Sequence, residues 1–310
     1  MTVRPTTAEV APPRTRTRVR GGRLPRSLRI AVLLAPALLV IGVLFLGGLA
    51  EGVAQSLGYL PFLPGWHWST SAYTGMLRDK AVTASFVLTF RTALLATVLS
   101  TVLGVGGALL IRSTRRGKRL LSAVFQSTLP VPHLVGALAM LLLLAQGGAL
   151  SRLTHALGLT STTDAFPELT NDRFGLGMLA EYCWKEAPFI GVVALSALGR
   201  GVTELEDAAR TLGAGRWARL RHVVLPVLAP GVLSTSILVF AFSFGSYEVP
   251  YLLGRPYPAT LPVVAYQYAT DVDLQSRPEA MAISVVIAVL ISALVAVYFA
   301  LSQRYLRRTA

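Results

Sequence analysis

The sequence contains a single cysteine, Cys183, in 310 residues, so it forms no internal disulfide and no thiolate metal cluster. Its four histidines lack the paired spacing typical of metal ligands; they are His67, His133, His155 and His222. No stretch matches the G-x-x-x-x-G-K-[S/T] phosphate loop, so we expect this chain to bind no ATP by that route and to carry no cofactor of its own. No Ser-His-Asp set is indicated, so nothing beyond isolated residues favours an enzyme.

Charged residues are also scarce. They make up 14% of the chain, against roughly 25% in a soluble domain, whereas 53% of the chain is hydrophobic. Apolar runs longer than about 18 residues are candidates for membrane helices. We therefore predict an all-α membrane protein with six spans, at 30–50, 84–111, 120–145, 176–198, 223–247 and 280–301. The second span carries Ser100, Gly104 and Ala108 at four-residue steps, which favours close helix packing, and the third is predicted to contain Pro130 and Pro132.

Acidic residues are few as well, with 15 Asp and Glu against 29 Lys and Arg, which gives a net charge of +14. Most basic residues fall in four segments, 1–29, 112–119, 200–221 and 302–310, and the loops between them hold few. This alternation predicts that both termini are cytoplasmic. We interpret 1–29 as a disordered basic arm, 30–301 as the six-helix domain and 302–310 as a cytoplasmic tail. Because the positive charge is spread over one membrane face without a recognition motif, we expect a lipid environment and no nucleic-acid partner.

The polar stretch 203–226 separates the fourth and fifth predicted spans. Thr203 is a suitable helix N-cap, and Glu206 three residues later completes a capping box. Gly213 is placed to end that helix in a left-handed conformation. The helix has an apolar face formed by Leu205, Ala208, Ala209 and Leu212. A second short helix is predicted to start near Gly215 and to carry Trp217, Leu220 and Val224 on one side, with Pro226 in the first turns of the next span.

This stretch resembles the EAA loop of ABC importer permeases, whose pattern is Glu-Ala-Ala, three residues, Gly, nine residues, Ile, one residue, Leu-Pro. Every spacing is met, and the departures are Asp207 for Glu and Val223 for Ile. In that family the loop fits a cleft on the ATP-hydrolysing subunit and couples hydrolysis to movement of the permease. The residues that the resemblance assigns to this coupling loop are Glu206, Asp207, Ala208, Ala209, Gly213, Val223, Leu225 and Pro226.

The resemblance implies a MetI-like ABC permease architecture in the bacterial plasma (inner) membrane. Such a permease works with two ATP-binding cassette ATPase subunits, which use the ATP, and with a second permease subunit, here expected to form a heterodimer. An extracytoplasmic solute-binding protein delivers the solute.

The fourth predicted span carries three ionisable residues, Glu181, Lys185 and Glu186. Charged groups at membrane depth are costly and mark either a buried pair or a transport pathway. Glu181 and Lys185 stand four residues apart, the favourable order for an ion pair, so a structural pair is the first interpretation and a translocation path the second. The segment Trp184-Lys185, two residues, Pro188-Phe189 also resembles the matching stretch of ABC permeases.

Glu248 begins the predicted external loop 248–279 and is the fourth candidate residue of the translocation path. Its surroundings, FSFGSYEVPYLLG, look like the end of the fifth helix in the polyamine-type branch of the importers. Acidic residues outnumber basic ones in the outer loops, and this net negative charge would attract a cation. Exclusion of Lys and Arg from outer loops explains the same balance without a cationic solute. Aromatic faces that bind ammonium groups are supplied by Tyr247, Tyr251, Tyr257, Tyr266 and Tyr268.

We therefore hypothesise a small organic cation of the putrescine or spermidine kind as the solute, ahead of a phosphonate, iron, thiamine or a sugar. Two other classes of protein remain as alternatives. An ion-coupled secondary transporter would use Glu181, Lys185 and Glu186 as a relay, and internal inverted repeats would favour it, but the sequence shows none. A membrane-embedded enzyme would need catalytic residues clustered at one membrane face.

Overall fold

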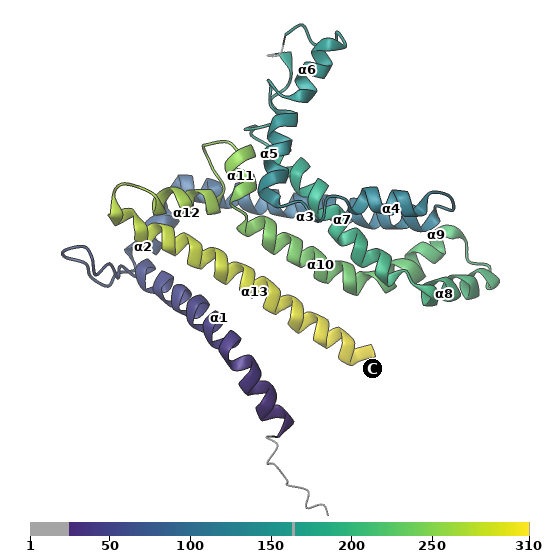
Figure 1. Cartoon of the computed structure of the whole chain (residues 1–310), viewed down its shortest axis with the longest axis horizontal. Coiled ribbons are helices and arrows are strands. Elements are labelled where there is room, and N and C mark those ends of the chain that lie inside the picture. Colours follow the sequence, from purple (N-terminus) through teal and green to yellow (C-terminus); the bar gives the residue numbers. More distant parts are fainter. Residues whose placement is uncertain (1–24, 163–164, 310) are drawn as a thin grey trace, which may run out of the picture. The chain divides into compact units, whose positions relative to one another are not determined.

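The structure is a computed structural model, and it describes residues 25–162 and 165–309 (Figure 1). The described part contains helices and no strand, which confirms the predicted all-α class. The chain divides into two compact units, residues 1–50 and 51–310, and each is described here by itself. The arm predicted for residues 1–29 lies mostly outside the described residues.

Most of the described part of the first unit belongs to α1 (Arg26–Ser56). Its apolar side chains are exposed on every side of the helix, and Leu33, Leu44 and Phe45 are each about 70% exposed. A helix that is apolar all round and exposed to this degree belongs in hydrocarbon rather than in water. The predicted first span is therefore present, and it continues six residues past its expected end at Ala50 to Ser56.

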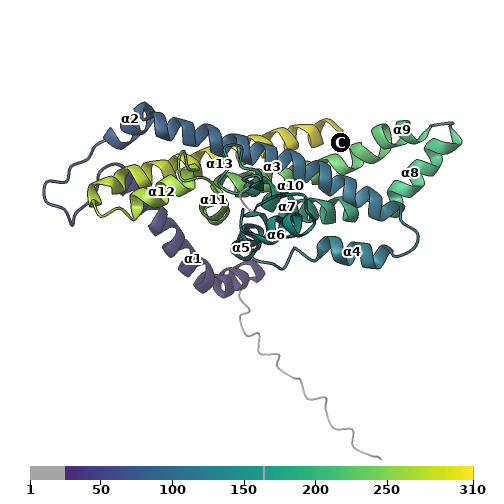
Figure 2. The ribbon, with the colours of Figure 1, turned by 90° about the horizontal axis from the view of Figure 1, so that it is seen from above.

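In the second unit, three helices pack side by side: α3 (Lys80–Ser113), α7 (Leu176–Ala197) and α10 (Leu225–Gly245) (Figures 1 and 2). The small-residue face predicted on α3 lies in this contact, because Ser100 and Ala108 are fully buried. A Cβ atom added at Gly104 would lie 2.5 Å from the carbonyl oxygen of Ala187 on α7. Glycine at this position thus lets the two backbones touch.

The predicted third span, 120–145, is wrong as a single helix. The chain instead forms α4 (Lys118–Gln126), an irregular segment, α5 (His133–Leu144) and α6 (Ala149–Ala156). Pro130 and Pro132 lie in the irregular segment, because proline lacks the N–H that a continuing helix needs and clashes with the preceding turn. The apolar stretch long enough to cross a membrane runs from His133 to Ala156.

Shorter helices connect and follow these elements. They are α2 (Ser71–Arg78), α8 (Arg200–Thr211), α9 (Arg216–Arg219), a π-helical turn (Leu220–Val224), α11 (Glu248–Leu253), α12 (Leu261–Ala269) and a 3-10 turn (Leu274–Ser276). The external loop predicted at 248–279 is therefore partly helical. The last long helix, α13 (Arg277–Thr309), packs beside α12 and α10.

Five helices among the described residues are long and apolar enough to cross a membrane. They rise to six when α7 is counted together with residues 201–211 of α8, from which it is bent by 67°. Glu181, Lys185 and Glu186 lower the hydropathy of α7, which explains why it does not stand out by composition alone. The count agrees with the six predicted spans.

The α3–α7 contact provides a test of the packing. We expect Gly104→Ala to lower the unfolding temperature of the purified chain in detergent, because its Cβ would meet backbone at 2.5 Å and overpacking costs about 1–3 kcal/mol. Gly106→Ala is the matched control on the same helix, since no atom lies within 4 Å of its added Cβ. Equal unfolding temperatures for the two variants would contradict the close approach.

Candidate functional site

The stretch that resembles a coupling loop begins at Gly199, the N-cap of α8. The capping box predicted for Thr203 and Glu206 is wrong, because the helix starts at Arg200 and both residues lie inside it. Their side chains instead meet Arg112 at the end of α3. Its Nη2 donates to Thr203 Oγ1 at 3.2 Å and to Glu206 Oε2 at 2.5 Å. One guanidinium group therefore ties α8 to α3.

The apolar face predicted on α8 is uncovered. Leu205 is 53% exposed and Leu212 is 88% exposed, whereas Val202 is buried against α7 and α10. Gly213 ends the helix with φ +85°, which confirms the left-handed conformation predicted there. The helix is thus fixed on one side and presents apolar side chains on the other.

The second short helix departs from its predicted register. Trp217 is 71% exposed, whereas Val224, predicted on the same side, is buried. The π-helical turn between them, closed by the bond from Leu225 N–H to the carbonyl oxygen of Leu220, adds a residue to the repeat and rotates the two side chains apart. Pro226 follows in the first turn of α10, as predicted, and its missing N–H accounts for the irregular turn.

Five of the exposed side chains of this region, which we call the α8–α9 surface, are Leu205, Asp207, Ala208, Leu212 and Trp217. Asp207 pairs with Arg210 at 3.2 Å, and both side chains are more than half exposed. Of the other predicted coupling residues, Glu206, Ala209 and Val223 are half-buried, and Gly213, Leu225 and Pro226 are exposed.

A second feature lies among the helices. A cavity of about 290 Å³ opens between α5, α7, α10 and the irregular segment before α5. We call it the charged cavity; its lining residues are Leu129, His133, Lys185, Glu186, Phe189, Leu238, Val239 and Phe242. Two of the four predicted path residues, Lys185 and Glu186, line it.

The predicted ion pair between Glu181 and Lys185 is wrong. The ammonium group of Lys185 instead donates to backbone carbonyl oxygens, at 2.8 Å to Thr128, 2.5 Å to Val131 and 3.5 Å to Leu129. The carbonyl oxygen of Thr128 also accepts from the N–H of Val131 at 3.1 Å, because the chain turns there and residue 132 is a proline without an N–H. Lys185 therefore adds a donor to the carbonyl groups at the break in the helix.

The two carboxylates turn toward His133. Oε1 of Glu181 lies 3.4 Å from Nδ1 of His133, and Oε1 of Glu186 lies 3.6 Å from its Nε2. The Glu181 side chain is fully buried, and among the described residues neither of its oxygens has a hydrogen-bond partner. His133 was not singled out from the sequence, because only the fold brings it between two residues of α7. Glu248, the fourth predicted path residue, is exposed at the start of α11 and does not line this cavity.

Three of the five predicted tyrosines gather near Glu248. The ring centroid of Tyr247 lies 5.1 Å from that of Tyr251 and 4.6 Å from that of Tyr266. Partial burial, together with Tyr266 and Tyr251, raises the pKa of Tyr247 to about 12, so this hydroxyl is neutral at physiological pH. Tyr257 and Tyr268 lie apart and line two other cavities.

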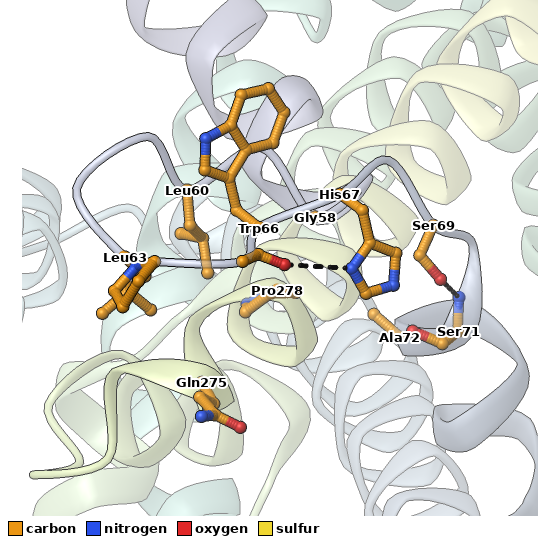
Figure 3. A pocket seen from close by; sticks show the side chains of 12 residues that line it. Gly58, Leu60, Leu63, Trp66, His67, Ser69, Ser71, Ala72, Gln275 and Pro278 are labelled. Carbon is orange, nitrogen blue, oxygen red and sulfur yellow. Dashed lines mark hydrogen bonds between the residues drawn. The ribbon is translucent and has the colours of Figure 1, made fainter.

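A cavity of about 450 Å³ lies under the loop that follows α1 (Figure 3). Trp66 and His67 border it from the loop, and Gln275 and Pro278 border it from the C-terminal part of the chain. Nδ1 of His67 lies 3.3 Å from the carbonyl oxygen of Gly65, so this ring is engaged within its own loop. The lining residues include no Asp, Glu, Lys or Arg, and the cavity therefore offers no charge to a solute.

Comparison with known proteins places these features in a family. The profile described as "Binding-protein-dependent transport system inner membrane component" matches residues 100–310. The inner membrane ABC transporter permease protein YnjC of Escherichia coli K12 is 29% identical over 228 residues, which cover 70% of this chain and 42% of YnjC. A probable molybdenum ABC transporter permease protein of Haloferax volcanii is 32% identical over 188 residues, covering 59% of this chain and 64% of that protein.

The aligned part of the chain thus spans less than two thirds of these two relatives. The putrescine transport system permease protein PotI of Escherichia coli K12 is 26% identical over 222 residues, covering 71% of this chain and 72% of PotI. Among solved structures, a bacterial ABC transporter involved in the import of the acidic polysaccharide alginate superposes with a TM-score of 0.70. It is 18% identical, and the match covers 90% of this chain and 97% of that one, which shows a shared fold.

The bond from Arg112 to α8 generates a prediction. We expect Arg112→Glu to loosen α8, because it places two carboxylates together where a charge-assisted bond worth about 1 kcal/mol stood. Hydrogen–deuterium exchange of the purified chain should then be about fivefold faster or more in the peptide covering 203–212.

The double variant Arg112→Glu with Glu206→Arg restores opposite charges and serves as the control. We expect it to recover most of the protection. Unchanged exchange in the single variant, or a double variant as loose as the single one, would show that this contact does not hold α8.

Proposed function

The chain belongs to the family of binding-protein-dependent transport system inner membrane components, and on this premise we propose that it is the permease subunit of an ATP-driven importer. In this proposal the chain forms half of the translocation path for a small solute. ATP is hydrolysed by two separate ATPase subunits, a second permease subunit completes the path, and an extracytoplasmic binding protein delivers the solute. Both termini face the cytoplasm.

The α8–α9 surface is the observation that carries the proposal. It exposes Leu212 and Trp217, which the described part of the chain leaves uncovered, beside the carboxylate of Asp207. Large apolar side chains exposed together on a polar, basic segment are typical of a protein–protein contact. The spacing of the segment matches the coupling loop of importer permeases, so the partner that fits best is the ATPase subunit.

The contacts of α8 with α3, α7 and α10 suit it to transmit a movement of that partner to these helices. Arg112 joins it to α3, and Val202 joins it to the core shared by α7 and α10. A displacement of the α8–α9 surface therefore bears on the three helices that pack at the centre of the second unit. Because packed cores transmit strain rather than absorb it, the helices are expected to move with their coupling segment.

The coupling role predicts that changes at Gly213 and Asp207 stop transport. Gly213→Asp should abolish solute uptake, because Gly213 has φ +85°, a conformation that costs other residues about 1–2 kcal/mol and that sets the exit of the chain from α8. Asp207→Lys should abolish uptake as well, by reversing a charge on the α8–α9 surface. Uptake is measured in cells, with the amount of inserted protein checked by immunoblot of the membrane fraction.

Gly215→Asp is the matched control. It adds the same charge to the same loop, but Gly215 has φ −67° and is the N-cap of α9, a position that aspartate favours. We expect normal uptake with this variant. Normal uptake with Gly213→Asp at wild-type protein level would rule out the coupling role.

For the solute we propose a small organic cation of the putrescine or spermidine kind. The charged cavity supports this choice, because the carboxylate of Glu186 lines it while the ammonium of Lys185 is bound to backbone carbonyls. A carboxylate at the cavity wall attracts a cation and disfavours an oxyanion beside it. Relatives do not decide the matter by themselves, since their names include putrescine, sulfate and molybdenum permeases.

Uptake of radiolabelled putrescine and spermidine, measured in cells with and without this gene, tests the solute. We expect uptake to fall on deletion and to return with the wild-type gene, whereas sulfate and molybdate uptake stay unchanged. Unchanged polyamine uptake together with loss of an anionic or neutral solute, such as a phosphonate or a sugar, would reject the cation and leave the importer in place.

A further inference from the structure

The buried carboxylates at the charged cavity have no ammonium partner. Glu186 lines the cavity together with Lys185, and Glu181 lies on the other side of His133, outside the lining. A charge buried in a low-dielectric interior is strongly unfavourable unless it is paired. The carboxylate of Glu186 therefore needs a partner that can reach it from the cavity.

Lys185 does not supply that charge to the carboxylates. Its three N–H donors are directed at the carbonyl oxygens of Thr128, Leu129 and Val131, and no ion pair within 4.0 Å joins it to Glu181 or Glu186 in the described structure. These bonds hold the ammonium group at the carbonyl oxygens of the break before α5 and away from the carboxylates. The group left without an ammonium partner is the carboxylate of Glu186, which borders the cavity.

Glu186 is an acceptor at the cavity wall. Its side chain is 8% exposed, it lines the cavity, and no hydrogen bond from a described residue reaches its oxygens. Its contact with His133 is longer, at 3.6 Å from Oε1 to Nε2. Behind His133 stands Glu181, fully buried and without a hydrogen bond of its own. Polar groups inside folded proteins are nearly always satisfied, so the oxygens of Glu186 that reach the cavity offer a place for a donor that enters it.

The walls of the cavity suit an alkylammonium group. Phe189 and Phe242 line it, and the ring of Phe242 lies 4.3 Å from the ring of His133, centroid to centroid. Aromatic faces attract cations, and the aliphatic side chains of Leu129, Leu238 and Val239 accept methylene groups. A volume of about 290 Å³ admits the head and short chain of a primary amine, and it is small beside the pockets that hold larger ligands.

We propose that the charged cavity is a binding site for a primary ammonium group, with Glu186 as its charge partner and the imidazole of His133 as a neighbouring acceptor. The site belongs to this chain alone, whereas its use as a step in solute passage rests on the proposed importer function. An ammonium group there would donate to the oxygens of Glu186, which receive no hydrogen bond from the described residues, and would pair with its charge.

The test is a binding measurement on the purified full-length chain in lipid nanodiscs, with the unfolding temperature followed against concentration of putrescine and n-butylammonium. Both amines should raise the unfolding temperature in a saturable way, because a ligand that binds only the folded state stabilises it. Tetramethylammonium, which has no N–H donor, and sodium ions at the same ionic strength should not.

Glu186→Gln keeps the shape of the side chain and removes its charge, so it should raise the apparent Kd of both amines at least tenfold. Asp271→Asn is the matched control, because Asp271 is an exposed carboxylate remote from the cavity lining, and it should bind as the wild type does. If Glu186→Gln does not fold, Phe242→Leu takes its place, with an expected loss of severalfold through the missing aromatic face.

Three results would overturn the proposal: equal stabilisation by sodium ions, amine binding unchanged in Glu186→Gln, or no amine effect on the wild type. This assay needs neither ATPase nor binding protein. Amine binding without polyamine uptake would reject the solute and keep the site, and polyamine uptake without amine binding would do the reverse.

Discussion

The constraint on which the second unit depends is that backbone polar groups within a membrane must be satisfied by the protein itself. Pro130 and Pro132 break the helix before α5, and the carbonyl oxygen of Thr128 accepts from Val131 N–H across the break. The ammonium group of Lys185 on α7 donates to the same oxygen and to that of Val131. These bonds draw the only cation among the cavity's lining residues to one wall, and so leave Glu186 facing an open space.

The α8–α9 surface and the charged cavity are connected through one contiguous core. Val202 of α8 and Val224 of the π-helical turn belong to the same buried cluster as Ile190 of α7 and Val239 of α10. Val239 also lines the charged cavity. The packing that holds α8 and the π-helical turn is therefore the packing that forms one wall of the cavity, and we expect a shift at one end to change the space available at the other.

The sequence predicted what depends on neighbours along the chain. The left-handed Gly213, the position of Pro226 and the close face around Gly104 follow from local backbone geometry and side-chain size, and the structure confirms them. The predictions that failed depend on distant partners. Thr203 and Glu206 were assigned to a capping box, but Arg112 binds both from 91 and 94 residues away.

Helical spacing favours a pair between Lys185 and Glu181, but carbonyl groups more than 50 residues earlier bind the ammonium group instead. Those carbonyls point at Lys185 only because the third predicted helix is broken. One local error, a continuous helix through Pro130, therefore carries over into the site. His133 was missed for the same reason, since its place between two carboxylates exists only once α5 begins there.

The burial of α7 decides how its charges should be understood. It contains three ionisable residues, yet Tyr182, Ile190 and Ala194 are fully buried, and Glu181, Lys185 and Glu186 are at most 6% exposed. The helix is covered by α3, α5 and α10, so its charged groups face protein and not lipid. A charge that faced lipid would destabilise the protein without compensation. A charge enclosed by three helices and a cavity is stabilised when a partner of opposite charge can enter. The least apolar span is therefore the central one. Entry of a cation into the cavity beside it would offset the free-energy cost of burying its carboxylates.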